Sequence, residues 1–233
     1  EAAARFAAHQ IAPHDLVDPD VTVDEMEGVC TDRMANGSGP GRPVYEEIKN
    51  SAPNGRCPLC GHRQVKTLDH YLPKSRYPSL AVSPVNLIPS CSDCNKAKMD
   101  LVPKVPTENP LHPYFDNLGV EPWLIGTVIE ERPSAVRFAV VPPASWDPVL
   151  AARVRRHFEV LELAVLYGSE AAEELSGLRH ELILMSDKAG SSVVRSELEA
   201  RAVSREMVRP NEWRAAAYRA WANSAWFCEG GFR

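Results

Sequence analysis

The sequence predicts an α+β protein in which a small cysteine-framed core is followed by a β-hairpin and a C-terminal helical region. Two Cys-x-x-Cys pairs enclose a segment without helical periodicity, two β-rich stretches follow it, and apolar residues then recur every three or four positions. Such segregation of strands and helices along a chain is typical of the α+β class. The expected parts are an irregular or helical extension at 1–43, the core at 44–116, the hairpin at 117–147 and the helical region at 148–233.

The N-terminal extension offers few signals for regular structure. Residues 1–12 are expected to form a short helix or a frayed end, and a second short helix is expected near 22–30. A further helix is predicted at 44–52, because Tyr45 and Ile48 stand three residues apart on one helical face.

The core segment alternates between extended and helical signals. Two short strands joined by a long loop are expected within 67–86, because three prolines there exclude a continuous helix. These prolines are Pro73, Pro78 and Pro84. A short helix is expected from Asn95 until shortly before Pro103, and the proline-rich stretch 101–113 is expected to be an extended connector.

A hairpin and then a helix are expected in the next part of the chain. Residues 123–129 and 134–141 are rich in β-formers, and apolar and polar residues alternate in the second stretch, which indicates a pair of strands. Beyond Pro148 the apolar spacing becomes helical. We expect the first helix to end at Gly168 and Ser169 to cap the second.

Two more helices are expected towards the C-terminus. The third covers about 190–208, and Asn211 is expected to cap the fourth. The fourth carries aromatic residues that either pack in a core or stack against a partner, and core packing is the more common outcome for an amphipathic helix. These residues are Trp213, Tyr218, Trp221, Trp226 and Phe227.

The composition narrows the class of protein. With 233 residues, 44% of them apolar, the chain can bury a core without depending on disulfides. No run of about 18 apolar residues is present, so no membrane span is expected. The first residues lack the apolar stretch of a signal peptide, and a cytoplasmic location is expected.

Positive charge is concentrated in one segment of an acidic chain. The net charge is −5, yet residues 56–104 hold eight Lys or Arg against three Asp or Glu. A local basic surface matters more for phosphate contact than the total charge does. The cysteine-framed segment is therefore the expected place for contact with a nucleic acid.

The cysteines of this segment indicate zinc. In a chain without a signal peptide, two Cys-x-x-Cys pairs about 30 residues apart favour a metal over disulfides. They supply four thiolates, the usual ligands of a closed tetrahedral structural zinc site. The expected zinc ligands are Cys57, Cys60, Cys91 and Cys94, whereas Cys30 and Cys228 are expected to be free thiols.

Polar residues between the cysteine pairs have the chemistry of a hydrolytic site. Asp69 and His70 are adjacent, and a regular strand would place them on opposite sides, whereas a strand end or a bulge could bring both into one pocket. There the carboxylate can bind a hard cation while the imidazole takes a proton from water. Asn95 can offer an amide oxygen to the same cation, and Asn86 is suited to orient the backbone or the imidazole. An Asp-His pair is usually only surface, but the frame of four cysteines strengthens this interpretation.

These residues resemble the HNH endonucleases, the ββα-metal nucleases, in their zinc-stabilised form. The resemblance covers about 45 residues and consists of C-x2-C, L-D-H-x-x-P-K, N-L and C-x2-C-N-x-x-K in order. It implies a small ββα-metal core in which His70 is the general base that activates water. Asp69 and Asn95 would hold one Mg²⁺ or Mn²⁺, and Asn86 would orient His70. The third motif position is often His in this family, and the Asn found here favours a cation that prefers oxygen.

The reaction implied by the resemblance is hydrolysis of a phosphodiester bond in DNA, with RNA as an alternative substrate. Four basic residues are candidates for phosphate contacts, which position the substrate without reading its sequence. They are Lys74, Arg76, Lys96 and Lys98. His112, just beyond the connector, either touches the site or packs with Tyr114 and Phe115 on the core.

The partner and the biological role are implied less directly. Bacterial HNH proteins of this size often act in phage defence beside an ATPase, as in Septu-type systems, although L-D-H-Y-L-P-K here differs from the E-H-F-R-P-K form of those nucleases. Self-association through the C-terminal helices is the other expected interaction. The competing function is a zinc-ribbon module that binds nucleic acid or protein without cleavage, which would have no need of Asp69, His70, Asn86 and Asn95 together.

Overall fold

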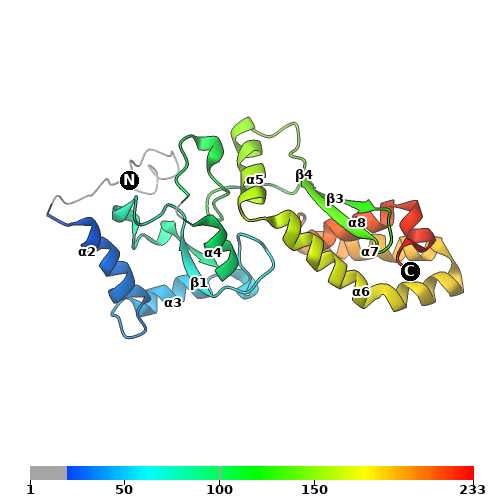
Figure 1. The fold of residues 1–233 in the computed structure, drawn as a ribbon, viewed down its shortest axis with the longest axis horizontal. Helices are drawn as coiled ribbons and strands as arrows, with labels where there is room; N and C mark the ends of the chain where they lie inside the picture. The colour runs from blue at the N-terminus through cyan, green and yellow to red at the C-terminus, as the bar shows by residue number, and fades with distance from the viewer. Residues whose placement is uncertain (1–19, 100) are drawn as a thin grey trace. The chain divides into compact units, whose positions relative to one another are not determined.

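The computed structural model describes residues 20–99 and 101–233, so the helix expected at 1–12 lies outside the described residues. The chain divides into two compact units, with the boundary between Asn117 and Leu118. Helices combine with two small antiparallel sheets, one in each unit, which confirms the predicted α+β class (Figure 1).

Helical segments precede the first sheet. Helix α2 (Val23–Gly28) begins at a capping box in which Thr22 and Glu25 satisfy each other's main-chain N–H groups. A π-helical segment (Val29–Ala35) continues it, and a loop leads to α3 (Arg42–Asn50). Short helices were predicted at 22–30 and 44–52, and both predictions are confirmed.

The first sheet and its following helix form the centre of unit 1. Strand β1 (Thr67–His70) pairs antiparallel with β2 (Leu87–Ser90), so that Asp69 lies opposite Ile88. Helix α4 (Ser92–Lys98) follows β2 almost directly and packs against β1. Two strands were expected within 67–86, and β2 begins one residue beyond that segment, at Leu87.

Helix α3 covers this two-stranded sheet. Leu68 of β1 and Leu87 of β2 form an apolar core with Met34, and Tyr45 and Ile48 of α3 pack against it. The hydroxyl of Tyr45 also accepts a hydrogen bond from the main-chain N–H of Leu68 at 3.3 Å. A two-stranded sheet is marginal alone, and this packing supplies the burial it needs.

The second unit opens with the predicted hairpin. Strand β3 (Leu124–Ile129) pairs with β4 (Ala135–Val140) in antiparallel register, which confirms that prediction. Gly126 lets β3 approach α8 (Trp213–Asn223) closely, because a Cβ there would lie 2.8 Å from the main-chain oxygen of Ala216. The hairpin is thus fixed onto the last helix by a contact that only glycine permits.

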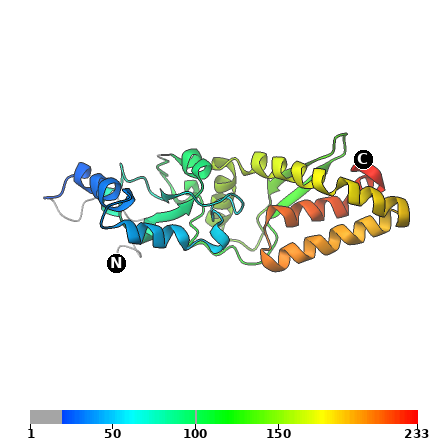
Figure 2. The same ribbon diagram turned by 90° about the horizontal axis from the view of Figure 1, so that it is seen from below.

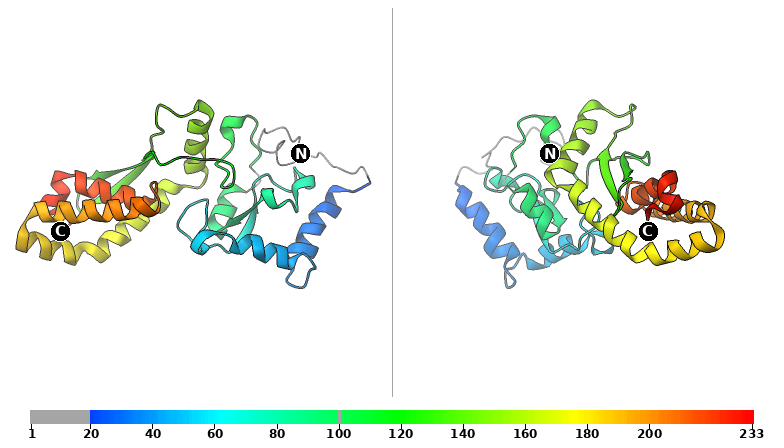
Figure 3. Two further views of the ribbon diagram at one scale, coloured as in Figure 1. Left: turned by 180° about the vertical axis from the view of Figure 1, so that it is seen from behind. Right: turned by 45° about the vertical axis from the view of Figure 1, so that its right-hand side comes forward.

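Helices make up the rest of the second unit. They are α5 (Pro148–Val160), α6 (Leu163–Ala189), α7 (Ser191–Val208) and α8. Figure 2 shows α8 lying between α6 and α7, and Figure 3 shows α6 and α7 running alongside each other. Gly190 lies between the end of α6 and the start of α7. A helix was predicted at about 190–208, and α7 confirms this prediction.

Two predicted helix boundaries in this unit are wrong. Gly168 lies inside α6, and the break falls instead at Glu162, whose φ is 50°. A glycine weakens a helix interior by only about 1 kcal/mol, which the burial of Leu166 and its neighbours in α6 outweighs. Ser169 is accordingly an internal residue of α6 and not a cap.

Asn211 does not cap α8. Glu212 is the residue before the helix, and the side-chain oxygen of Asn211 accepts hydrogen bonds from the N–H groups of Trp123 and Leu124 at 2.8 and 3.3 Å. The residue thus joins the start of the hairpin to the start of α8. Of the two alternatives for the aromatic residues near the C-terminus, core packing is correct for four of them, and Trp226 is half-buried. The buried members are Trp213, Tyr218, Trp221 and Phe227.

Within the described residues, no helix has both the length and the apolar character needed to cross a membrane.

Candidate active site and zinc centre

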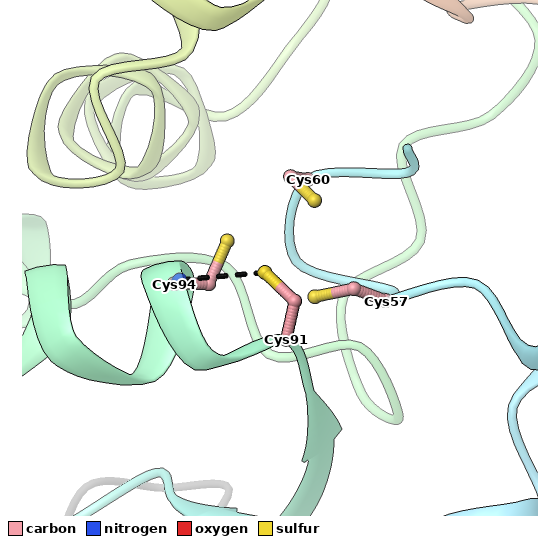
Figure 4. Close-up of side chains that lie close together, drawn as sticks. All are labelled: Cys57, Cys60, Cys91 and Cys94. Atoms are coloured by element: carbon pink, nitrogen blue, oxygen red, sulfur yellow. Dashed lines mark hydrogen bonds between the residues drawn. The ribbon is translucent and has the colours of Figure 1, made fainter. Parts of the chain in front are cut away.

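Four cysteines meet where α4 begins. The sulfur atoms of Cys57, Cys60, Cys91 and Cys94 all lie within 4.8 Å of one another, and all four side chains are buried. Figure 4 shows two sulfurs coming from the turn before β1 and two from the start of α4, pointing toward a common centre. Zinc binds thiolates at about 2.3 Å in tetrahedral geometry, which needs sulfurs at close mutual distances of this kind. The cluster fits the zinc site predicted from the spacing.

The local sequence folds each pair into a chelating arrangement. On the first pair, Cys57 donates its N–H to the oxygen of Arg63 and Gly61 donates to the oxygen of Cys57, both at 2.8 Å. Gly61 has a φ of 64°, a left-handed conformation that favours glycine. On the second pair, Cys91 is the N-cap of α4, and its sulfur accepts a hydrogen bond from the N–H of Cys94 at 3.4 Å. Each pair is therefore held by hydrogen bonds within its own turn, between backbone groups in the first pair and from a backbone N–H to a cysteine sulfur in the second.

Asp69 and Lys98 form a buried ion pair between β1 and α4. The Lys98 ammonium lies 3.0 Å from Oδ2 of Asp69, donates to Oδ1 at 3.3 Å and donates to the main-chain oxygen of His70 at 2.6 Å. Both side chains are only 3% exposed. The end of β1 and the last turn of α4 are therefore joined through one lysine.

The Asp69 carboxylate is buried and lies against a positive charge. Burial raises the pKa of Asp69 above its ordinary value, and the positive charge of Lys98 acts in the opposite direction. Although Oδ2 is buried and close to the ammonium, it receives no hydrogen bond from any residue that the structure describes. A buried carboxylate oxygen of this kind fits a hard divalent cation, which takes oxygen ligands.

His70 is held in one tautomer by the backbone. Its Nε2 lies 2.8 Å from the main-chain oxygen of Ala81. A carbonyl oxygen can only accept, so Nε2 carries the proton and Nδ1 of the neutral ring has a free lone pair. Nδ1 makes no hydrogen bond to any described residue. The ring is thus arranged as a base that can take a proton at Nδ1.

The surroundings of His70 favour its neutral form. Burial lowers the pKa of His70, the bond to Ala81 opposes this, and the positive charges of Lys74 and Lys98 lower it further. Cys30, from the π-helical segment, places its sulfur 3.5 Å from Nε2. Burial also raises the pKa of the Cys30 thiol, so this neighbour stays uncharged beside the imidazole.

Asn86 organises the loop between the strands and does not contact His70. Its side-chain oxygen accepts from the N–H of Leu72 at 2.8 Å, and its amide donates to the oxygens of Leu72 and Leu80 at 3.0 and 3.2 Å. Leu80 directly precedes Ala81, the partner of His70. Asn86 is 0% exposed, and its hydrogen bonds to described residues all go to the backbone of this loop.

Asn95 and the basic candidates occupy different environments. Asn95 is half-buried on α4, three residues before Lys98, so the two side chains share one face of the helix. Lys96 and Arg76 are exposed and Lys74 is half-buried.

Lys98 departs from the role expected for it. It was expected to contact phosphate, but it is buried against Asp69 and the oxygen of His70. In that position the ammonium is not open to a substrate. The other three basic residues keep the exposure that a phosphate contact requires.

His112 supports the core. Its Nε2 donates to the main-chain oxygen of Val85 at 3.0 Å, and Nδ1 accepts from the N–H of Tyr114 at 3.2 Å. Its ring lies 4.3 Å from the ring of Tyr71 and 4.5 Å from that of Phe115. Of the two expectations for this residue, the structure supports packing on the core.

The sequence did not reveal Cys30 as a neighbour of His70, and it gave Lys98 a different role. Cys30 contacts His70 across 40 positions of chain, and no local pattern marks such a contact. Lys98 was identified as basic, and its spacing of three from Asn95 placed it on the same helical face. Because Lys98 shares a helical face with Asn95, its position could have indicated a role inside the site and not a contact at the surface.

Comparison with known proteins finds one matching family model and similar proteins from a phage and a bacterium. A family model described as HNH endonuclease matches residues 57–101. Protein ea31 of Escherichia phage lambda is 30% identical over 236 aligned residues, which cover 95% of this chain and 79% of that protein. Septu protein PtuB of Bacillus thuringiensis is 30% identical over 86 residues, 34% of each chain. No solved structure gives a significant match.

Proposed function

We propose that this chain, which belongs to the family of phage lambda protein ea31 and carries an HNH endonuclease domain at residues 57–101, hydrolyses phosphodiester bonds in DNA. The observation that carries the proposal is the arrangement of His70, whose Nε2 donates to Ala81 while Nδ1 keeps its lone pair, directly after the buried Asp69 in the chain. A protein that only binds nucleic acid needs neither an oriented base nor a buried carboxylate next to it.

The proposed reaction begins with a proton transfer. Nδ1 of His70 accepts a proton from a water molecule, and the water oxygen attacks phosphorus. The bond from phosphorus to the 3′ oxygen breaks, and the 3′ oxygen leaves and takes a proton from solvent. The products are a 5′-phosphate and a 3′-hydroxyl. His70 returns to its neutral form by losing its proton to water.

Asp69 and Asn95 are the proposed holders of a divalent cation, Mg²⁺ or Mn²⁺. Asp69 offers the oxygen that lacks a hydrogen bond, and Asn95 offers an amide oxygen from the adjacent helix. A cation bound there would supply positive charge to the phosphate and the leaving oxygen. Asn86 keeps the loop that carries Ala81 in place, so that His70 remains oriented.

The zinc centre has a structural role in this proposal. Four thiolates close the coordination shell, so water and substrate have no open position on that metal. Cys94 immediately precedes Asn95, so the centre fixes the part of α4 that faces β1. Lys74, Arg76 and Lys96 are the proposed phosphate contacts.

We further propose that the protein acts in phage defence beside a partner protein. The similarity to a protein named for the Septu system supports it, over about a third of this chain. The similarity to a phage protein over most of the chain equally supports a role on the phage side. The catalytic chemistry above is the same in either setting.

Plasmid cleavage tests the nuclease function. Purified zinc-loaded protein is incubated with supercoiled plasmid, with and without Mg²⁺ or Mn²⁺, beside His70→Ala. His180→Ala is the matched control, because His180 is an exposed histidine of α6. We expect metal-dependent cutting by the wild type and the control, and a loss of about 10²–10⁴ in rate for His70→Ala. Binding of the plasmid without any difference in cutting between wild type and His70→Ala would favour the non-catalytic zinc-ribbon module.

A further inference from the structure

Lys98 is a fully buried lysine whose ammonium contacts only oxygen atoms. It is 3% exposed, and its three neighbours are the two carboxylate oxygens of Asp69 and the main-chain oxygen of His70. Lysine is rarely fully buried unless it is paired, because its charge must be removed from water. The chain nevertheless places this lysine at the centre of the proposed active site.

The position of Lys98 in the fold explains what the contact can do. Lys98 is the last residue of α4, and Met99 after it turns away with a φ of 45°. Asp69 and His70 are the last two residues of β1. The lysine therefore joins the end of the strand that carries the carboxylate to the end of the helix that carries Asn95.

The ammonium of Lys98 lies against both oxygens of the Asp69 carboxylate. Oδ2 is the nearer at 3.0 Å, and Oδ1 accepts a hydrogen bond at 3.3 Å. A carboxylate can bind the lysine and a second cation at once, because each of its oxygens has two lone pairs.

We infer that Lys98 is a positioning residue for the divalent cation site: it clamps β1 to α4, so that Oδ2 of Asp69 and the side chain of Asn95 are presented to the same ion. This inference rests on the proposed function, because it concerns the cation of that function. Lys98 contacts neither substrate nor the attacking water in this arrangement. It acts through Asp69 and the His70 backbone.

A competing interpretation predicts the opposite effect on binding. If the ammonium were a placeholder that the divalent cation must displace, removal of the lysine would strengthen cation binding. If it served only to stabilise the fold, its removal would leave the affinity of the folded protein unchanged. The affinity for the cation therefore separates all three interpretations without any measurement of cleavage.

The test is Mn²⁺ binding to the zinc-loaded full chain, followed by electron paramagnetic resonance. Lys98→Met keeps the length of the aliphatic side chain and removes the charge. Lys98→Arg keeps the charge, but its planar fork can donate to both carboxylate oxygens and so occupy Oδ2. Lys96→Met is the matched control, because Lys96 is an exposed lysine of the same helix.

We expect both Lys98 variants to bind Mn²⁺ at least tenfold more weakly than the wild type, with zinc content unchanged and with Lys96→Met unaffected. If Lys98→Met does not fold, Lys98→Gln takes its place as a second neutral side chain, because Lys98→Arg alone would bind Mn²⁺ more weakly under the placeholder interpretation as well. Folded Lys98 variants that bind Mn²⁺ as tightly as the wild type, or more tightly, overturn the inference. A wild type that binds Mn²⁺ through Asp69 but leaves DNA intact would overturn the nuclease function and leave the role of Lys98 standing.

Discussion

The imidazole of His70 donates from Nε2 to the main-chain oxygen of Ala81 across 2.8 Å. This bond fixes the tautomer of the ring, since a carbonyl cannot donate. It also fixes which nitrogen can take a proton. Because Ala81 belongs to the loop between β1 and β2, the tautomer of His70 depends on the conformation of that loop. The loop is in turn held by Asn86, so the base of the proposed reaction depends on residues that never touch it.

The rate of cleavage should depend on pH through His70. Burial lowers the pKa of this histidine below its ordinary value of about 6.5, and two lysines lower it further. A base acts when it is neutral, so the rate at saturating Mg²⁺ should rise with pH and level off after an inflection below about 6.5. The measurement is the single-turnover rate of cleavage of a labelled duplex between pH 5 and 8. An inflection clearly above that value would contradict a buried His70 as the base.

Replacement of one zinc-cluster cysteine should unfold the proposed active site. Cys57→Ser removes a thiolate from a closed four-sulfur site, and structural zinc contributes directly to folding. We expect zinc content to fall far below one ion per chain and the thermal transition of the first unit to be lost. Cys228→Ala, a buried thiol outside the cluster, is the control and should keep its zinc. Full zinc content in Cys57→Ser would show that the four sulfurs are not the ligands.

Asn86→Ala should lower both stability and activity. The side chain is fully buried and makes three hydrogen bonds to the backbone of Leu72 and Leu80. Each buried group left unpaired costs roughly 1–3 kcal/mol of unfolding free energy. The measurement is urea unfolding together with the cleavage rate, and Asn223→Ala, an exposed asparagine at the end of α8, is the control. Equal stability of the Asn86 variant and the control would argue against the loop-organising role.

The salt dependence of DNA binding should report the proposed phosphate contacts. Removal of one basic side chain that binds a phosphate is expected to make the slope of log Kobs against log salt shallower by about 0.9. Combined replacement of Lys74, Arg76 and Lys96 by Gln is therefore expected to flatten the slope and weaken binding, measured by fluorescence anisotropy without Mg²⁺ or Mn²⁺. Lys188→Gln, an exposed lysine of α6 in the second unit, is the control. An unchanged slope in the triple variant would show that DNA binds to another part of the protein surface.

The sequence carried most of the information about the metal centre and less about its surroundings. The spacing of Cys57, Cys60, Cys91 and Cys94 was sufficient, because a Cys-x-x-Cys turn is a local structure. The contact of Cys30 with His70 was not predictable, since it arises from the packing of a distant helical segment. The burial of Lys98 likewise depends on how α4 meets β1, and sequence charge alone indicated a surface residue.

Helix boundaries in the second unit show the same limit. Gly168 is a stop signal by local preference, but the apolar face of α6 continues through it and packing decides the outcome. Asn211 is a good cap by type, yet its side chain binds the backbone before β3, which lies far away in sequence. In both places a tertiary contact outweighed a local preference.

The most direct test of the central claim is the fate of the water oxygen. Cleavage of a DNA duplex by the wild-type protein with Mg²⁺ in water enriched in ¹⁸O, followed by mass spectrometry of the fragments, reports which bond forms. We predict a 5′-phosphate that has gained one ¹⁸O and a 3′-hydroxyl that has gained none, with neither product from His70→Ala. Absence of cleavage, or fragments whose 5′-phosphate carries no ¹⁸O, would contradict hydrolysis by a water molecule that His70 activates.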